Sequence, residues 1–442
     1  MNWKPRSLGE ALRHRKGSIT IDDATSYKLC RVQLHRRGVV LRQHLRGAEI
    51  RTKKQQVCKS GDFLVAEMDA KVGGYGFVPP ELDGAIVSSH YYLFEVDASK
   101  LHPPYLEVIS QARILQQQIV PKGSTNYSSI RPGSVLAWKI PLPEMDVQKR
   151  VARNFEIIRV KLASVKDEIT HQETLLAKLK QTILQEAISG KLTADWRNAH
   201  PDVEPASQLL HRIQVEKARL IAAKKLRPEK PVPKITPAEI PFEIPQGWEW
   251  CRLGAIAQHS LGKMLDKGKN RGRPLPYLRN LNVRWYEFDL SDLKTMPFEE
   301  RESGKYSVQR NDVLICEGGH GIGRSAVWNS DDAVMFQKAL HRVRFIGGLY
   351  LPELFVHFLR LSEMTGHITN YFTGAGIPHF TGAAIHEMSI PLPPLAEQAV
   401  IVERVKTLME HCQELATEID HSRNHAAHLL QAVLKEAFAP AS

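Results

Sequence analysis

The tetrapeptide IPLP occurs twice, at residues 140–143 and 390–393, and a long stretch free of proline and glycine follows each copy. The two copies are 250 residues apart, and the similarity continues when the chain is shifted by that distance. Gln148 aligns with Gln398, EITH at 168–171 with EIDH at 418–421, and QTILQEA at 181–187 with QAVLKEA at 431–437. A match of this length without gaps indicates an internal duplication.

The stretch after each IPLP copy has the heptad spacing of a coiled coil, with apolar residues separated alternately by three and four positions. At about 1.5 Å per residue, each helix is expected to be about 65–70 Å long. The seams carry one polar residue each, Gln172 and Ser422, which are equivalent under the same shift and would fix the register. We expect the two helices to pair with each other rather than to be unrelated surface helices. The predicted seam residues are Val151, Phe155, Ile158, Leu162, Val165, Ile169, Ile401, Val405, Leu408, Leu415, Ile419 and Leu429.

The segments before the two helices also resemble each other, more weakly. SGDFLVAE at 60–67 lies opposite RNDVLICE at 310–317, and Gly73 lies opposite Gly323. Both segments mix short β-branched or aromatic runs with glycine-rich turns and end in a helical stretch, at 105–119 and 351–367. We therefore predict an α/β (α+β) protein with two similar globular domains and a pair of long helices.

The predicted domain order is globule, helix, connector, globule, helix. The first domain covers 1–139, the first helix 140–190, the connector 191–245, the second domain 246–389 and the second helix 390–442. The connector is expected to contain a helix around 207–225. It then becomes rich in proline, which favours an extended linker.

The net charge is +12, and the basic excess lies in the first domain, most densely between Arg31 and Lys54. Phosphate binding is the usual use of such a region, although a solvated basic surface is the alternative. The sequence has no apolar run of transmembrane length, and MNWKPRSLGE at 1–10 has no signal-peptide core. The five cysteines form no CxxC pair. We expect a cytoplasmic protein with reduced, buried thiols.

Four features of the sequence partly match known catalytic or binding motifs, but none of them predicts an active site. HPPY at 102–105 and FTGAG at 372–376 resemble parts of amino-methyltransferases, but His102 lacks the acceptor oxygen that the first position must offer. EGGHGIGRS at 317–325 could cradle phosphate as a glycine-rich turn, but no GK[ST] follows, so we expect a tight turn between strands. EMDAK at 67–71 contains the DxK part of some metal nucleases, but no partner acid is identifiable upstream, so we expect a surface turn. The 19 histidines show no HExxH-like spacing. We therefore predict neither a catalytic residue nor a metal site.

Several segments together resemble the specificity subunit of type I restriction–modification enzymes. IPLPPLAEQ at 390–398 and ILQEAISGKLTADWR at 183–197 carry the resemblance most specifically. IPQGWEWCRLGAI at 244–256, PYLRN at 276–280, NDVLICEGG at 311–319 and FQKALHRVRF at 336–345 resemble pieces of target-recognition domains. The resemblance covers essentially the whole chain. One departure is Val147, which stands where the second copy has Glu397.

The resemblance implies a non-catalytic DNA-binding subunit. Two target-recognition domains would each read one half of a split site in double-stranded DNA, and two antiparallel helices would set the gap between the halves. Two modification (methyltransferase) subunits and restriction (translocase–nuclease) subunits would assemble around it. The resemblance implies S-adenosylmethionine, ATP and magnesium in those partners and no cofactor in this chain.

Basic and amide side chains in both domains are the candidate DNA contacts, because arginine and lysine bind phosphate and arginine and asparagine also read base edges. In the first domain they are Arg36, Arg37, Arg42, Arg46, Lys53, Lys54, Lys71 and Lys122. In the second domain they are Lys263, Lys267, Lys269, Arg271, Arg273, Arg279, Asn280, Arg324 and His379.

Two other functions fit the sequence less well. An enzyme, either a methyltransferase or a fused restriction enzyme, is disfavoured because the acceptor before PPY is missing. A purely structural coiled-coil scaffold is disfavoured by the basic first domain and by the size of the non-helical parts.

Overall fold

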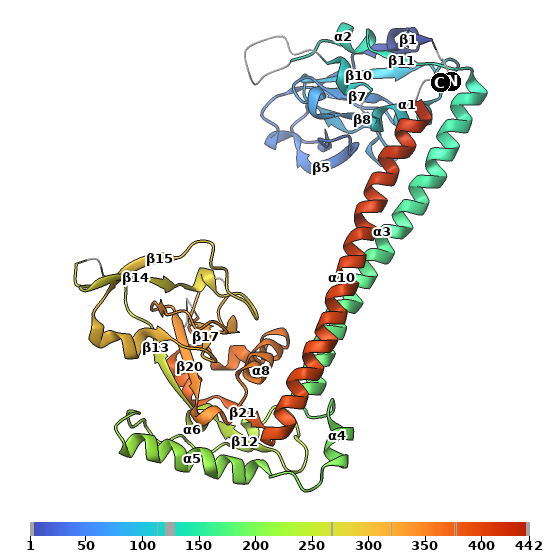
Figure 1. Ribbon diagram of the computed structural model, residues 1–442. Helices are drawn as coiled ribbons and strands as arrows, with labels where there is room; N and C mark the ends of the chain where they lie inside the picture. Colours follow the sequence, from blue (N-terminus) through green and yellow to red (C-terminus); the bar gives the residue numbers. More distant parts are fainter. Residues whose placement is uncertain are drawn as a thin grey trace. The chain divides into compact units, whose positions relative to one another are not determined.

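The computed structural model describes residues 4–112, 114–119, 129–266, 268–319, 321–374, 376 and 378–438, apart from the side chains of 430–431 and 435–438. The chain divides into two compact units (Figure 1). Unit 1 consists of residues 1–171 and 419–442, and unit 2 of residues 172–418. Each unit contains one globular domain and about half of each long helix. Among the described residues, no helix is long and apolar enough to span a membrane.

The domain of unit 1 is built on two sheets. A four-stranded antiparallel sheet has the order β2-β10-β7-β8, and a five-stranded sheet has the order β3-β6-β9-β4-β5. The strands are β1 (Pro5–Ser7), β2 (Leu12–Arg15), β3 (Ser18–Thr20), β4 (Ser26–Val32), β5 (Val39–Arg46), β6 (Lys54–Val57), β7 (Phe63–Ala66), β8 (Tyr75–Phe77), β9 (Ile86–Val87), β10 (Tyr91–Val96) and β11 (Lys139–Pro141). The helices are α1 (Pro103–Gln111) and α2 (Pro132–Leu136).

The domain of unit 2 also has two larger sheets, with the orders β13-β20-β17-β18 and β15-β14-β19-β16. Its strands are β12 (Glu249–Arg252), β13 (Ala257–Leu261), β14 (Arg273–Leu278), β15 (Lys294–Phe298), β16 (Ser307–Val308), β17 (Val313–Cys316), β18 (Ser325–Val327), β19 (Val334–Phe336), β20 (Leu340–Phe345) and β21 (Ser389–Leu392). Its helices are α4 (Ala194–Ala199), α5 (Ala206–Ala222), α6 (Leu253–Ile256), α7 (Ser303–Tyr306), α8 (Pro352–Met364) and α9 (Gly382–Glu387).

The duplication read from the sequence is present in the fold. The strands of the two four-stranded sheets occur in the same spatial order, and β7 and β8 begin 250 residues before β17 and β18. In both halves an early strand pairs antiparallel with the IPLP strand, as β1 with β11 and β12 with β21. The IPLP segment therefore closes each domain and leads into a long helix.

The long helices are α3 (Met145–Ile188) and α10 (Leu395–Phe438), each of 44 residues. In unit 1, Phe155 near the start of α3 packs with Leu434 near the end of α10. In unit 2, Ile183 near the end of α3 shares a core with Ile401 near the start of α10. The two helices therefore run antiparallel to each other.

The helix pair buries one seam position per heptad more fully than the other. Phe155, Leu162 and Ile169 on α3 are buried, whereas Val165 remains 43% exposed. In a pair, each helix is covered by only one neighbour, so a seam side chain at the margin of the contact stays partly exposed to water. Of the predicted seam residues, Ile401, Val405 and Ile419 are also buried, Val151, Ile158 and Leu408 are half-buried, and Leu415 and Leu429 are exposed.

The helices differ from the sequence predictions in several places. The long helices expected over 140–190 and 390–442 begin at Met145 and Leu395, because the start of each IPLP copy belongs to strand β11 or β21. The stretch expected to be helical over 105–119 ends as helix α1 at Gln111, because Ala112 has an extended backbone and the hydrogen-bonding pattern stops there. The connector contains α4 in addition to the expected helix, which is α5.

Candidate nucleic-acid interface

A buried glutamine joins each domain to its long helix in the same way. The Gln148 side-chain oxygen accepts a hydrogen bond from the His102 backbone N–H at 2.8 Å, and its amide N–H donates to the Pro143 carbonyl at 2.8 Å. Gln398 accepts from the Leu351 N–H at 2.8 Å and donates to the Pro393 carbonyl at 3.0 Å. The second proline of IPLP thus supplies the acceptor in both halves. This joint fixes the direction in which the helix leaves the domain.

The β4–β5 hairpin presents a basic face in the first domain. His44 and Arg46 occupy alternate positions of β5, which is an edge strand, and Arg42 lies at the β-bulge where the pairing with β4 shifts. All three are exposed. Alternate residues of a strand point to the same side. Lys28 of β4 pairs with His44 and extends this face. Of these residues the sequence indicated only the two arginines, because the strand pairing that adds Lys28 is not visible in a local pattern.

The turn of this hairpin lies against the loop that carries Lys71. His35 and Arg36 both have positive φ, at 60° and 63°, and their N–H groups donate to the carbonyls of Val72 and Gly73. A shallow hollow of about 370 Å³ is lined by His35, Arg36, Lys71 and two glutamines. The fold therefore brings together Arg36 and Lys71, which are far apart in sequence, and Arg37 is exposed next to them.

The other predicted contacts of the first domain are more scattered. Lys53 is partly engaged, because its ammonium group donates to the Gly47 carbonyl at 2.8 Å and pairs with Asp23. Lys54 is exposed at the start of β6. Lys122 lies outside the described residues.

Three loops converge on one place in the second domain. Asn280 follows β14, the glycine-rich turn joins β17 to β18, and His379 forms isolated bridges with Gly318 and Thr373. A Cβ atom added at Gly318 would lie 3.1 Å from His379 Nδ1, and one added at Gly319 would lie 3.7 Å from the Asn280 amide nitrogen. The turn therefore brings Asn280 and His379 to one surface.

Arg279 is held in place beside this surface. Its guanidinium donates to the Asp292 carboxylate at 2.9 Å and to the Asp292 carbonyl at 2.6 Å, and only 17% of its side chain is exposed. Hydrogen bonds from Lys294 and Arg279 lower the pKa of Asp292. Arg279 is therefore better suited to positioning the loop that presents Asn280 than to contacting DNA itself.

The remaining basic residues of the second domain divide into exposed and buried groups. Lys269, Arg271 and Arg273 are exposed along the segment that leads into β14, and Arg324 is half-buried in the β17–β18 turn. Lys263 is buried, and its ammonium group donates to Glu302 at 2.5 Å and lies 4.9 Å from the centre of the Phe298 ring. Because this charge is already compensated inside the domain, Lys263 is not placed to contact DNA. Lys267 lies outside the described residues.

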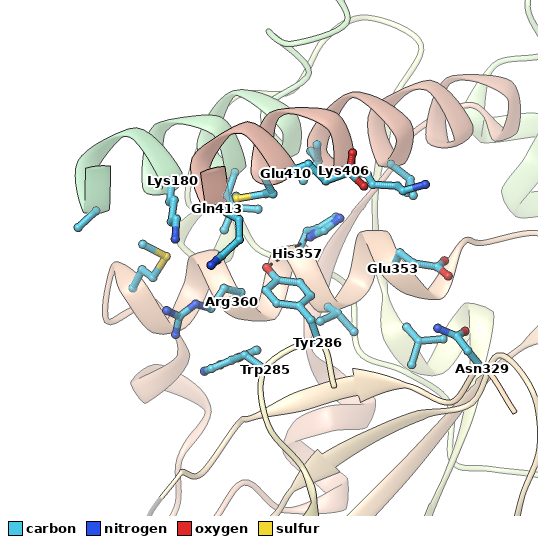
Figure 2. Close-up of a pocket in the computed structure, with 18 residues that line it drawn as sticks. Lys180, Trp285, Tyr286, Asn329, Glu353, His357, Arg360, Lys406, Glu410 and Gln413 are labelled. Atoms are coloured by element: carbon cyan, nitrogen blue, oxygen red, sulfur yellow. Dashed lines mark hydrogen bonds between the residues drawn. The ribbon is translucent and has the colours of Figure 1, made fainter. Parts of the chain in front are cut away.

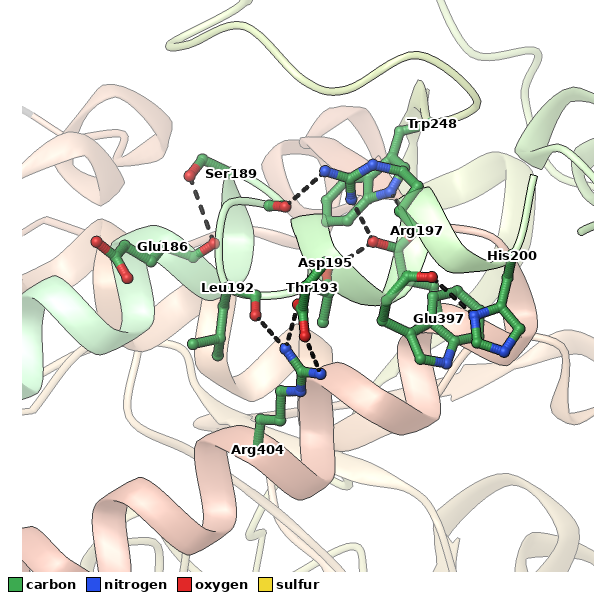
Figure 3. A network of polar contacts seen from close by, with 12 residues as sticks. Glu186, Ser189, Leu192, Thr193, Asp195, Arg197, His200, Trp248, Glu397 and Arg404 are labelled. Atoms are coloured by element: carbon green, nitrogen blue, oxygen red, sulfur yellow. Dashed lines mark hydrogen bonds and ion pairs between the residues drawn. The ribbon is translucent and has the colours of Figure 1, made fainter.

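A buried carboxylate anchors the connector to α10 in unit 2 (Figure 3). Glu397 is fully buried and accepts hydrogen bonds from the Thr193 hydroxyl at 2.7 Å, the Arg197 guanidinium at 2.5 Å and the Trp248 indole N–H at 2.8 Å. Nearby, Arg404 pairs with Asp195 and lowers the pKa of that carboxyl to about 2. The segments ISGKLTADWR and IPQGWEW thus meet at Glu397. The equivalent position in the first half of the chain is Val147, which has no charge.

A separate groove of about 660 Å³ lies between α8, the loop at Trp285 and Tyr286, and the two long helices of unit 2 (Figure 2). Arg360 stacks over the Trp285 ring at 5.1 Å, and Tyr286 lies next to His357, whose pKa is lowered to about 4 by burial. None of the predicted DNA contacts lines this groove. It is therefore distinct from the surface formed by the three converging loops.

Comparison with protein families places a known domain on the second half. Residues 245–421 match the family described as type I restriction modification DNA specificity domain. The chain is 29% identical over 276 residues to the EcoAI specificity subunit of Escherichia coli, covering 60% of this chain and 45% of that protein. It is 27% identical over 289 residues to the EcoEI specificity subunit of Escherichia coli, covering 60% and 46%. The chain thus spans about half the length of these curated relatives.

Two solved structures share the fold. A chain from a structure of type I R-M complex assembly and conformational transition has a TM-score of 0.71 and 18% identity, with 99% of this chain and 97% of that chain covered. The HsdS subunit from Thermoanaerobacter tengcongensis has a TM-score of 0.58 and 18% identity, with 99% and 96% covered. These comparisons confirm the resemblance to type I specificity subunits and the predicted fold class.

Proposed function

We propose that this chain, which is similar to type I specificity subunits, is the sequence-specific DNA-binding subunit of a type I restriction–modification complex. Each domain would read one half of a bipartite site, and the paired helices would set the gap between the halves. The duplicated domain carries this proposal: two four-stranded sheets of the same order are joined to antiparallel helices through the same buried glutamine.

Duplicated readers suit a split target for a geometric reason. Two related domains that contact one duplex read half-sites separated by about one helical turn or a multiple of it, as dimeric DNA-binding proteins do. Here the two domains belong to one chain and differ in their second sheets and loops. The two half-sites are therefore expected to differ in sequence, which makes the whole site asymmetric.

The exposed basic residues and the converging loops have different expected roles. Arg42, Arg46 and Lys269 are exposed and suit phosphate contacts, which position a protein without reading sequence. Asn280 lies on a surface formed by three loops, and an asparagine side chain can pair with the major-groove edge of adenine. His379 and Arg324 border the same surface. We propose that these loops read bases in the second half-site.

Catalysis is assigned to partner subunits. We propose that two methyltransferase subunits dock on the paired helices, that restriction subunits join them, and that S-adenosylmethionine, ATP and magnesium are bound by these partners. The chain would then determine where both methylation and restriction occur. Exposed apolar residues on α3, such as Ile157 and Val160 at 49% and 57% exposure, are candidate docking contacts.

The test is to co-express the chain with its neighbouring modification subunit in a host that lacks both, and to map methylated adenines across the genome. We expect a split motif, with two short specified blocks around a fixed unspecified gap. An Asn280→Ala variant provides the matched control, because it should relax one block and leave the other unchanged. Absence of a motif, or the same motif without this chain, would contradict the proposal.

A further inference from the structure

Three side chains from distant parts of the sequence meet inside unit 2. Glu229 belongs to the connector, His259 to β13 and His386 to α9. Each offers one ligand atom, and these three atoms all lie within 4.8 Å of one another. The Nδ1 atom of His259 is 3.8 Å from the Glu229 carboxylate, and the two imidazole ring centres are 5.6 Å apart.

The orientation of His386 is fixed by the backbone. Its Nε2 atom lies 3.1 Å from the Lys230 carbonyl oxygen, and a carbonyl can only accept, so Nε2 carries the proton and donates. Nδ1 is then left with a lone pair. It is buried and has no hydrogen-bond partner among the described residues, and His386 is only 9% exposed. An imidazole held through one nitrogen by a carbonyl, with the other free, is the usual arrangement of a metal ligand.

Two glycines leave space for these rings. A Cβ atom at Gly254 would lie 2.3 Å from His386 Nδ1, and one at Gly382 would lie 2.9 Å from His259 Nε2. The first distance is far too short for any side chain, so a residue other than glycine at 254 would displace the His386 ring. Glycine is therefore required at positions 254 and 382 for the two imidazole rings to take their present positions.

The neighbouring charges leave one carboxylate oxygen available. Lys217 donates to Glu229 Oε2 at 2.7 Å and to the Gly254 carbonyl at 2.5 Å, whereas Oε1 is the oxygen on the His259 side. His341, a further buried histidine, has its ring centre 6.5 Å from that of His259.

We propose that Glu229, His259 and His386 bind one zinc ion, which ties the connector to the second domain. Two imidazoles and one carboxylate suit zinc, whereas magnesium and calcium prefer all-oxygen sites. Ligand atoms around tetrahedral zinc are about 3.3–3.4 Å apart, given zinc–ligand distances of about 2.0–2.1 Å. The cluster must therefore contract slightly on binding. The fourth position remains for water or for His341.

The local sequence pattern could not reveal this site. His259 and His386 are separated by most of the second domain, and Glu229 precedes both in a proline-rich segment. The expectation that the chain holds no metal ligands rested on short spacings such as HExxH. The fold assembles the three residues by placing the connector beside α9. The proposal does not depend on the DNA-binding function, because it concerns only how the connector is held.

The test uses the full-length protein, first freed of metal by a chelator. We expect isothermal titration to show one zinc ion bound per chain, and cobalt to give the visible absorption of a tetrahedral site. Glu229→Gln and His386→Gln should each weaken zinc binding at least tenfold. His211→Gln, which alters an exposed histidine on α5, is the matched control and should leave binding unchanged. Magnesium should not compete.

A second measurement addresses the connector. Trypsin can cleave after Lys225 and Lys234, on either side of Glu229, whereas Arg227 and Lys230 precede proline and resist it. Zinc should slow cleavage at these two sites in the wild-type protein but not in Glu229→Gln. If His386→Gln fails to fold by circular dichroism, Glu229→Gln carries the test because Glu229 is only half-buried. Equal zinc affinity in all variants would show adventitious binding and overturn the proposal. Specific binding without protection from trypsin would overturn the connector's role.

Discussion

The two halves of the molecule agree where a domain meets its helix and differ where it faces outward. Gln148 and Gln398 make equivalent hydrogen bonds, and the buried Asp62 and Asp312 each accept a backbone N–H at 2.7 Å and pair with an arginine. The second sheets differ in strand number and order. The duplication has thus kept the glutamine joints and changed the second sheets, as expected if these joints set geometry and the outer surfaces set specificity.

The anchor at Glu397 is the largest difference among the joints. It gathers Thr193, Arg197 and Trp248 in unit 2, whereas Val147 occupies the equivalent position in unit 1 and is half-buried. A buried charge that holds three donors fixes a segment more firmly than an apolar contact does. The connector and the second domain are therefore locked to α10 in a way that the first domain is not locked to α3.

Replacing Glu397 should have the largest effect. Glu397→Ala leaves the Arg197 charge and the Trp248 N–H without their partner, and loss of one member of a buried ion pair typically costs about 3–5 kcal/mol. Chemical denaturation would measure the free energy of unfolding. Val147→Ala is the matched control and should cost about 1 kcal/mol or less. Equal losses in the two variants would remove the distinction between the halves.

The two glutamine joints should have smaller and similar effects. Gln148→Ala and Gln398→Ala each leave a backbone N–H and a proline carbonyl without a partner, which costs about 1–3 kcal/mol for a buried group. Denaturation of both variants under the same conditions would compare them. A difference between the two losses greater than about 2 kcal/mol would show that the joints are not equivalent, despite their matching geometry.

Variants of the proposed base contact and of the proposed phosphate contacts should change DNA binding in different ways. Asn280→Ala should cost about 1–3 kcal/mol in discrimination between cognate and altered DNA, because one base contact is lost. Arg42→Ala combined with Arg46→Ala should weaken binding to all sequences alike and reduce the salt slope by about 2. Fluorescence anisotropy at several salt concentrations would measure both. Lost discrimination in the arginine variant would reverse the assigned roles.

The repeated and periodic features of the fold could be predicted from the sequence. The repeated IPLP located the two segments that form α3 and α10. Their heptad spacing identified them as long helices, because such spacing over many turns is a strong signal. The equivalence of Gln148 and Gln398 was visible as a match, although its physical reason, a hydrogen bond to the preceding IPLP carbonyl, required the structure.

Contacts between distant segments could not be predicted in this way. Lys263 reads as a surface lysine in the sequence but is buried against Glu302, since burial depends on the β14–β15 hairpin folding over it. Glu397 differed visibly from Val147, yet its three partners come from two other segments of the chain, Thr193 and Arg197 from one and Trp248 from the other. The cluster of Glu229, His259 and His386 has the same origin. In each case tertiary contact, rather than local spacing, decides the role of the residue.

The division of the long helices between the units has a consequence for synthesis of the chain. Unit 2 is a continuous segment, residues 172–418, whereas in unit 1 Phe155 of α3 packs against Leu434, which comes from the later part of the chain. On the ribosome, the domain made first therefore keeps an apolar helix face uncovered until the residues after 418 have been made, and unit 2 can be completed before them. The apolar face at the start of α3 thus stays without its partner helix while residues 172–418 are being made.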